Sequence, residues 1–198
     1  MKFFINSASP FARKVRIAVR EKGLLDRAEE FSTAPVDSHP DLMAANPISQ
    51  IPAMIDDLGV CWTDSALICA WLDTQSPVNR LLPDEGDALW AVRRLEVRAA
   101  GLCEMLVRMV LDRRRPENEQ SPFWLKRWED NLLRGFAAAD ALCPAAGTLD
   151  LATITLVIAA TYTDFRYRHL DWRTAAPKIA ALQMELEKRP SFIDTYPK

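Results

Sequence analysis

The chain has few of the residues that build metal centres or disulfide frameworks. Its 198 residues include only two histidines and four cysteines. No two cysteines form a Cys-x-x-Cys pair, and no histidine stands at metal-ligand spacing from them. We therefore expect no metal site, and we expect the cysteines to be small buried thiols in a reducing cytoplasm. They are Cys61, Cys69, Cys103 and Cys143.

Charge and hydropathy argue against two further classes of protein. The net charge of -2 gives no electrostatic case for a nucleic-acid partner. The longest apolar run, around residues 156–160, falls well short of the roughly 18 residues that a membrane span needs. Residues 1–5 are also too short for the apolar region of a secretory signal. We expect a cytoplasmic protein with neither a nucleic-acid nor a membrane partner.

Strand and helix patterns alternate in residues 1–76. We expect strands at 2–6 and 29–33, helices at 10–22 and 65–74, a helical turn at 40–45, and a hairpin of strands at 52–56 and 60–63. Apolar residues share one face of the helix at 10–22. We expect its basic side chains to lie largely outside that face: Arg13, Lys14, Arg16 and Arg20. This order of elements predicts a small α/β domain over residues 1–76.

Only helical patterns occur in residues 88–198, after a turn-rich segment at 77–87 that we expect to be a linker. The helices are expected at 88–114, 123–142, 150–168 and 175–188, with Pro190 as a stop. The helix at 150–168 is apolar enough to be the buried centre of a bundle, and Asp150 is expected to cap it. The predicted fold class is therefore a small α/β domain followed by an all-α domain.

Ser9 marks the most informative junction of the chain. It stands between the first strand and a helix that starts with Pro10, a residue suited to a first helical turn. The hydroxyl is thereby placed beside helix-start N–H groups, where an anion is favoured. An ordinary helix cap is the simpler interpretation of the same residue.

Four motifs in the same order and spacing give the chain its family resemblance. They are Ser9-Pro10-Phe11, the segment at 46–53 (NPISQIPA), Asp64-Ser65 and the tail at 189–192 (RPSF). Over essentially its whole length the chain resembles the glutathione transferase superfamily, in particular serine-type cytosolic members and bacterial proteins similar to YibF. The resemblance implies a thioredoxin-like N-terminal domain, an all-helical C-terminal domain, glutathione as co-substrate and a homodimer.

The resemblance implies that Ser9 activates the thiol of glutathione. Its hydroxyl would donate a hydrogen bond to the thiolate, helped by the helix that it caps. Ser7 and Asn6 are alternatives for that contact. The cysteine of thiol-transfer classes is absent here, which argues against a mixed disulfide on the protein.

Two further segments are implied to bind glutathione. A cis peptide bond before Pro52 would turn the backbone of Ile51 toward the peptide part of the ligand, and Gln50 would reach its glycyl end. Asp64 would contact the ammonium group, and Ser65, at a helix start, the γ-glutamyl carboxylate. The resemblance adds Phe11 to this set.

The second substrate is the least defined part of the prediction. The resemblance implies that this substrate lies against the helical domain, where five residues could line its pocket: Met105, Arg108, Met109, Asp112 and Trp124. Packing in the core is the simpler interpretation of Met and aromatic residues at helical spacing. The basic run at 113–115 reads as a solvated helix end that could favour an anionic co-substrate.

The leading hypothesis is a glutathione transferase that directs the thiolate at a small electrophilic or disulfide substrate. Glutathione-dependent peroxidase or disulfide reductase activity would use the same residues. The alternative class is a non-catalytic, transferase-like binding protein similar to the stringent-starvation regulators.

Overall fold

Strand β1 (Lys2–Ile5) lies inside a four-stranded mixed sheet in the order β2-β1-β3-β4. It pairs in parallel with β2 (Glu29–Ser32) and antiparallel with β3 (Ala53–Ile55), which pairs antiparallel with β4 (Cys61–Trp62). The two parallel strands need a crossover, and the helix between them supplies it. The computed structural model describes all residues, 1–198.

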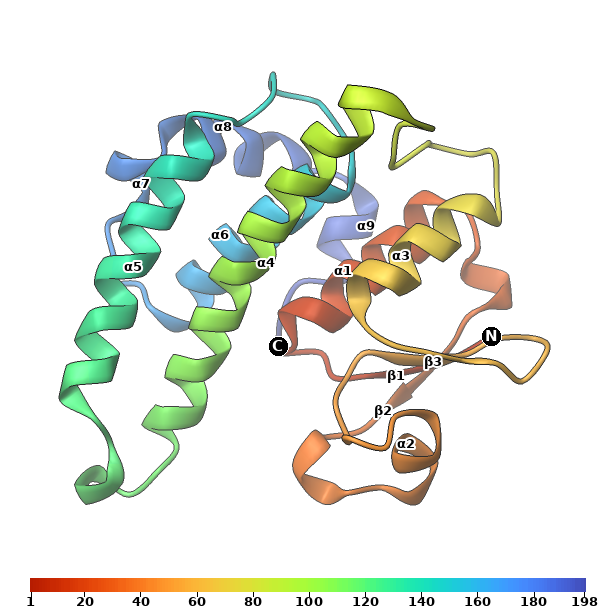
Figure 1. The fold of residues 1–198 in the computed structure, drawn as a ribbon, viewed down its shortest axis with the longest axis horizontal. Helices are drawn as coiled ribbons and strands as arrows, with labels where there is room; N and C mark the ends of the chain where they lie inside the picture. The colour runs from red at the N-terminus through yellow and green to blue at the C-terminus, as the bar shows by residue number, and fades with distance from the viewer. The chain divides into compact units, whose positions relative to one another are not determined.

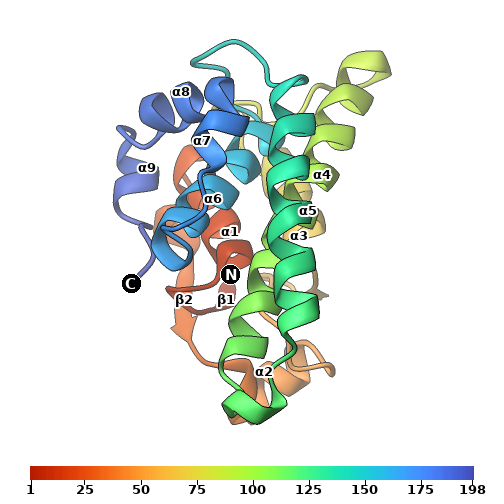
Figure 2. The same cartoon turned by 90° about the vertical axis from the view of Figure 1, so that its left-hand side faces the viewer.

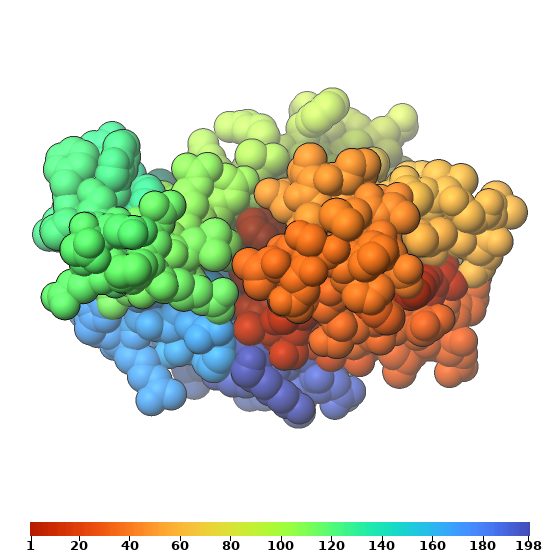
Figure 3. All heavy atoms as spheres, turned by 90° about the horizontal axis from the view of Figure 1, so that it is seen from below, coloured from red at the N-terminus to blue at the C-terminus, as the bar shows by residue number.

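Three α-helices belong to this sheet: α1 (Pro10–Glu21), α2 (Pro40–Ala45) and α3 (Ser65–Thr74). Helices α1 and α3 pack against each other, as Figure 1 shows. Two short 3-10 helices, η1 (Leu25–Arg27) and η2 (Pro35–Asp37), complete the connections. Figure 3 shows η2 and α2, in orange, on the surface of this part of the protein. The predicted elements of residues 1–76 are confirmed to within two residues.

The chain divides into two compact units, Met1–Leu82 with Pro190–Lys198, and Pro83–Arg189. The last nine residues, which the sequence assigned to the helical domain, therefore belong to the first unit. Their short helix α9 (Pro190–Ile193) contacts α1, and Phe192 is fully buried. Pro190 begins this helix, and does not merely stop the one before it.

Docking of this tail corrects one prediction for α1. Arg13 and Lys14 were expected to lie outside the buried face, but each is only 2% exposed. The Nη2 of Arg13 donates to the carbonyl of Phe192 at 3.1 Å, and its guanidinium lies over the rings of Phe192 and Tyr196 at 5.7 and 5.5 Å. Arg16 and Arg20, which pair with Glu30 of β2, stay partly exposed. The tail thus covers a part of α1 that helical periodicity assigns to solvent.

The second unit is helical: α4 (Gly86–Arg113), η3 (Glu117–Glu119), α5 (Pro122–Asp140), α6 (Leu151–Arg166), α7 (Trp172–Ala175) and α8 (Pro177–Leu186). Helices α4 and α5 pack side by side, and α6 packs against α4 and α8, as Figures 1 and 2 show. Every residue of α6 from Leu151 to Thr163 is buried. The predicted buried central helix is confirmed, and with it the α/β-plus-helical fold class.

Asp150 caps α6 as predicted. Its side chain accepts from the N–H of Thr153 at 2.8 Å, and the Thr153 hydroxyl accepts from the N–H of Asp150 at 2.9 Å. This reciprocal pair satisfies two amides at the start of a buried helix. Burial raises the pKa of Asp150, although its hydrogen bonds with Thr153 oppose the shift.

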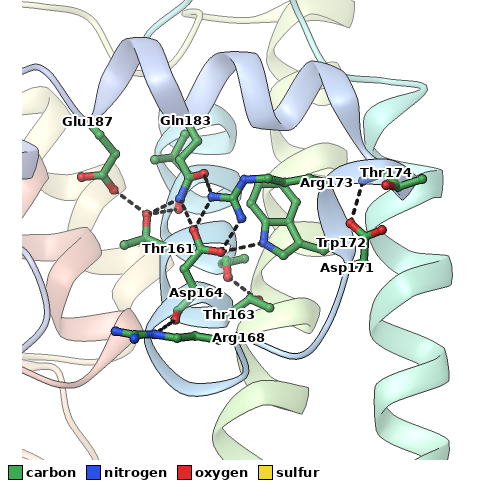
Figure 4. Close-up of polar contacts among 12 residues, drawn as sticks. Thr161, Thr163, Asp164, Arg168, Asp171, Trp172, Arg173, Thr174, Gln183 and Glu187 are labelled. Carbon is green, nitrogen blue, oxygen red and sulfur yellow. Dashed lines mark hydrogen bonds and ion pairs between the residues drawn. The ribbon is translucent and has the colours of Figure 1, made fainter.

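Asp164 organises the other end of α6, as the close-up in Figure 4 shows. Both guanidinium branches of Arg173 donate to it at 2.7 Å, and Trp172 and Gln183 donate at 2.9 Å each. Burial alone would raise the pKa of Asp164, but these hydrogen bonds outweigh it and hold the pKa below its ordinary value. One carboxylate thus joins α6 to α7 and α8.

The cysteine prediction is partly wrong. Cys69 and Cys103 are buried, but Cys61 is exposed on the two-residue edge strand β4 and Cys143 is half-buried. All four are free thiols. Burial, reinforced by the nearby Asp140, raises the pKa of Cys143 to about 11. None of the helices is both long enough and apolar enough to span a membrane.

Candidate functional site

The register of the sheet brings three segments to one end. Phe4 of β1 lies opposite Ala53, and Trp62 of β4 lies opposite Met54. If this antiparallel register is continued past the strand ends, the segment before β3 meets the C-terminal ends of both β1 and β4. The loops that carry Ser9, Ile51-Pro52 and Asp64-Ser65 therefore leave the sheet at the same end, all within the first unit.

Ser9 is the N-cap residue of α1. Its Oγ accepts from the N–H of Ala12 at 3.2 Å, Pro10 follows in the first turn, and the residue is half-buried. Accepting this bond uses a lone pair of the hydroxyl and leaves its hydrogen free to donate. The capping role and the thiol-activating role, which looked like rivals in the sequence, are therefore compatible.

Asn6 shapes the turn that presents Ser9. Its Oδ1 accepts from the N–H of Ala8 at 2.9 Å, and its main-chain carbonyl accepts from the N–H of Ser9 at 3.1 Å. Asn6 thus organises the turn, a function that the sequence reasoning did not assign to it. Ser7 stands in the same turn and is half-buried.

Asn46 organises the loop that leads to Pro52. The residue is 5% exposed, its Nδ2 donates to the carbonyl of Gln50 at 2.9 Å, and its Oδ1 accepts from the N–H of Ile48 at 3.3 Å. The peptide bond between Ile51 and Pro52 is cis, as expected. Sequence reasoning missed the role of Asn46, although Asn before Pro is a turn signal that could have indicated it.

Ile51 is anchored by its side chain while its backbone stays outside the ladder. The side chain packs against the core cluster that contains Phe4 and Leu42. Because β3 begins only at Ala53, the N–H and C=O of Ile51 lie beyond the paired residues of the sheet. An extended peptide ligand could pair with such a backbone as an added strand. Gln50, just before it, is exposed.

Asp64 and Ser65 form the start of α3. Asp64 is the N-cap, and its Oδ1 accepts from the N–H groups of Ala66 and Leu67 at 2.9 and 3.3 Å, which leaves Oδ2 available to a ligand. Ser65 is 5% exposed and is the first helical residue. Its N–H belongs to the helix-start amides, which lack a partner within the helix and favour an anion. The peptide bond before Asp64 is also cis, which the sequence did not indicate.

The hairpin before α3 is tied together by Trp62. Its Nε1 donates to Asp56 at 2.9 Å, and its ring lies 5.2 Å from that of Trp71. This hydrogen bond lowers the pKa of Asp56, with help from the backbone amides of Val60 and Leu58. The hydrogen bond and the ring contact of Trp62 hold β4 in place, and Asp64 follows β4 two residues later.

The five residues predicted to line the second-substrate pocket all lie in the helical unit. Met109 is fully buried, and Asp112 accepts from the N–H of Ser121 at 3.1 Å. Met109 therefore packs in the core, and Asp112 stabilises the turn after α4. The other three show more surface: Met105 is half-buried, Arg108 is exposed and Trp124 is 47% exposed.

Phe11 is half-buried in the first turn of α1. No group of three or more His, Cys, Asp or Glu side chains is arranged to hold a metal ion.

Comparison with known proteins identifies the family. Residues 8–75 match the family model described as glutathione S-transferase, N-terminal domain. A glutathione transferase family member from Pseudomonas fluorescens Pf-5, solved with bound glutathione, superposes with a TM-score of 0.92 at 33% identity, covering 100% of this chain and 98% of the other.

Two further relatives agree. A glutathione S-transferase from Methylobacillus flagellatus KT, solved with bound glutathione, has a TM-score of 0.88 at 32% identity over 100% of this chain and 99% of the other. The uncharacterized GST-like protein YibF of Escherichia coli K12 is 28% identical over 100% of this chain and 98% of its own. The chain belongs to the glutathione transferase family, with a thioredoxin-like first unit and a helical second unit.

Proposed function

We propose that this protein is a glutathione transferase in which Ser9 stabilises the thiolate of bound glutathione. The observation that carries the proposal is the cap of α1, in which the Ser9 hydroxyl accepts from the N–H of Ala12. A hydroxyl that accepts in this way can still donate its own hydrogen to a thiolate. Two relatives with over 30% identity were solved with glutathione bound, which supports glutathione as the ligand.

The thiolate needs stabilisation because a free thiol has a pKa of about 8.5 and only the thiolate attacks electrophiles. A hydroxyl donor and the N-terminal end of a twelve-residue helix both favour the charged sulfur. Lowering the pKa by about one to two units corresponds to about 1.4 to 2.7 kcal/mol of preferential interaction with the thiolate. Ser9 acts as a hydrogen-bond donor in this scheme and never becomes covalently attached.

The remainder of glutathione would be held by the other two loops of the site. The backbone of Ile51 pairs with the cysteinyl backbone, Gln50 reaches toward the glycyl end, and Phe11 contributes contact area. The N–H and hydroxyl of Ser65 bind the γ-glutamyl carboxylate, and Oδ2 of Asp64 accepts from the ammonium group.

The thiolate then attacks a small electrophilic or disulfide substrate held against the helical unit, where Met105, Arg108 and Trp124 retain exposed surface. Reduction of a disulfide or a hydroperoxide would start from the same thiolate. We also propose a homodimer, as the family resemblance implies, and a cytoplasmic location, in keeping with the four free thiols.

Retention on glutathione-agarose combined with turnover of a chlorodinitrobenzene tests the proposal. The wild-type protein should be retained and should form the conjugate. The Ser9→Ala variant should still be retained but should turn over about ten to a hundred times more slowly, corresponding to about 1.4 to 2.7 kcal/mol. Ser7→Ala is the matched control from the same turn.

Two results would contradict it. Retention of the wild-type protein without turnover of the chlorodinitrobenzene, a hydroperoxide or a disulfide would favour a binding protein of the regulator type. Loss of turnover in Ser7→Ala but not in Ser9→Ala would move the thiol-activating role to Ser7.

A further inference from the structure

His39 caps the short helix α2 with its ring. Its Nδ1 accepts from the N–H of Asp41 at 3.2 Å, and its main-chain carbonyl accepts from the N–H of Met43 at 3.0 Å. Most helices use Asn, Asp, Ser or Thr at this position, and their side-chain oxygens accept without losing a proton first. A histidine nitrogen accepts only while it carries no hydrogen. The cap of α2 therefore requires a neutral ring with its hydrogen on Nε2.

Aromatic neighbours hold the His39 ring at the start of α2. The ring meets that of Phe31 of β2 edge-on, with the ring centres 5.0 Å apart, and Phe31 lies 5.5 Å from the buried Phe4 of β1. His39 itself is half-buried. Its ring is thus fixed against the sheet with Nδ1 directed at the first turn of the helix.

The charged groups around His39 come from four elements. Lys2 of β1 pairs with Asp41 of α2 at 3.1 Å. Asp37 of η2 is two residues before His39, and Glu29 is on the same side of β2 as the ring that His39 contacts. Asp41 is engaged by Lys2, and none of these carboxylates pairs with the imidazole. A proton gained at Nδ1 would therefore face the N–H of Asp41 and would replace an attraction by a repulsion.

Helix α2 supports the backbone that is proposed to bind glutathione. Leu42 and Ala45 are buried in a core cluster against which Ile51 packs. Asn46, which ends the helix, donates from its N–H to the carbonyl of Leu42 at 2.7 Å, and its side chain holds the carbonyl of Gln50. The helix lies on the opposite side of the sheet from α1 and α3, as Figure 1 shows. The position of Ile51 and of the loop before it thus depends on a folded α2.

A helix of six residues depends strongly on its cap. The amides at a helix start have no partner within the helix, and so short a helix is unstable by itself. Pro40, the first helical residue, has no N–H to satisfy, and His39 satisfies the N–H of the next residue. Loss of a cap typically shifts a folding equilibrium about fivefold.

We propose that His39 is a positioning residue of the glutathione site and makes the affinity for glutathione depend on pH. The role of His39 rests on the proposed function, because it acts on the loop of that site. Histidine is the side chain whose charge ordinarily changes between about pH 5 and 8. As the pH falls, Nδ1 gains a proton, the cap is lost, and the fraction of molecules with Ile51 in place decreases. The apparent affinity decreases with that fraction.

Nitrogen NMR of the imidazole tests the cap without a ligand. At about pH 7.5 the ring of His39 should carry its hydrogen on Nε2 and none on Nδ1. On acidification to about pH 5, the protection of the α2 amides against hydrogen exchange, corrected for the intrinsic effect of pH, should fall about fivefold. A hydrogen on Nδ1 at the higher pH, or equal protection at both pH values, would overturn the proposal.

Calorimetric titration with S-methylglutathione tests the effect on affinity, because this ligand has no thiol that could titrate. The wild-type Kd should be about three to five times higher at about pH 5 than at about pH 7.5. His39→Asn, whose amide oxygen caps at either pH, should bind as the wild type does at the higher pH and should lose this rise. His39→Ala should bind about as weakly at both pH values as the wild type does at the lower one.

The matched control is His169→Asn, which replaces the other histidine of the chain and lies in the helical unit. This variant should keep the pH dependence of the wild-type protein. A Kd that does not rise in the wild type, or a rise that persists in His39→Asn, would overturn the role of His39 and leave glutathione binding intact. No binding of S-methylglutathione at either pH would overturn the proposed function, and the role of His39 in affinity with it.

Discussion

The buried side-chain amide of Asn46 donates to the main-chain carbonyl of Gln50 at 2.9 Å, four residues along the chain. The side-chain oxygen of Asn46 accepts from the N–H of Ile48, and the main-chain carbonyl of Asn46 accepts from the N–H of Ser49 at 2.8 Å. These bonds hold the loop whose end is the cis peptide bond before Pro52. The geometry offered to a peptide ligand at Ile51 therefore depends on a residue that need not touch the ligand.

Replacing Asn46 should consequently impair glutathione binding indirectly. Asn46→Ala removes two side-chain hydrogen bonds in a buried place, which should lower the free energy of unfolding by about 1 to 3 kcal/mol and raise the Kd for glutathione several-fold. Urea unfolding and calorimetric titration measure the two effects. Ser49→Ala, which loses one exposed contact with the carbonyl of Pro35, is the control. An unchanged Kd in Asn46→Ala would show that the loop keeps its shape without this side chain.

Ser65 should determine the affinity for glutathione and should not affect the pKa of the bound thiol. Ser65→Ala removes the hydroxyl proposed for the γ-glutamyl carboxylate but leaves the α3 amides in place, so the Kd should rise about tenfold, or about 1.4 kcal/mol. The pKa of the bound thiol should not change. Ser32→Ala, an exposed serine of β2, serves as control for the calorimetric titration. A shifted thiol pKa with unchanged Kd would contradict the division of roles between Ser9 and Ser65.

Asp73 should be a major determinant of stability in the first unit. It is 3% exposed, and it accepts from the ammonium of the buried Lys22 at 2.9 Å and from the N–H groups of Leu81 and Leu82 at 2.8 and 3.1 Å. Asp73→Asn leaves Lys22 as a buried charge without its counter-ion, which typically costs about 3 to 5 kcal/mol. Urea unfolding should show this loss.

The comparison for Asp73 is Asp41→Asn, which breaks an exposed pair with Lys2. That change should cost no more than about 1 kcal/mol. Equal effects of the two substitutions would mean that the Lys22 ion pair is not a special contributor.

Asp164 should make the helical unit sensitive to acid. Its pKa in the folded protein is below the ordinary value, so its stabilising contribution is complete above the pKa of the unfolded chain, about 3.9, and is lost as the pH falls through the lower, folded pKa. Asp164→Asn should reduce stability at pH 7 and flatten the loss of stability on the acid side. Denaturant midpoints from about pH 3 to 7 measure both effects. The prediction would be wrong if the denaturant midpoint of Asp164→Asn fell with decreasing pH as steeply as that of the wild-type protein.

Local signals made much of the fold predictable. The helices α2 and α3 begin and end at the expected residues, because Pro40 and the cap at Asp64 are short-range signals. The helix cap at Ser9 was expected for the same reason, because Ser9 stands directly before Pro10. The cis bond before Pro52 was expected only from the family resemblance. Asp150 was expected as the α6 cap from its position before an apolar run.

Long-range contacts account for most of what was missed. Arg13 follows the pattern of a solvent-facing residue on α1, and only the contact with Phe192, 179 residues away, buries it. Periodicity within one helix contains no information about such a partner. The sequence likewise did not indicate that Asp164 joins three helices, because the three residues that donate to it lie in α7 and α8.

The pKa of the thiol of bound glutathione tests the central claim most directly. Thiolate absorbance at about 240 nm, followed as a function of pH, gives that value for the wild-type protein and for Ser9→Ala. We predict a wild-type pKa at least about one unit below that of free glutathione, and a value in Ser9→Ala that returns toward the free one while the Kd stays within a few-fold. The same lowered pKa in both proteins, with the rise found in Ser7→Ala instead, would contradict the account.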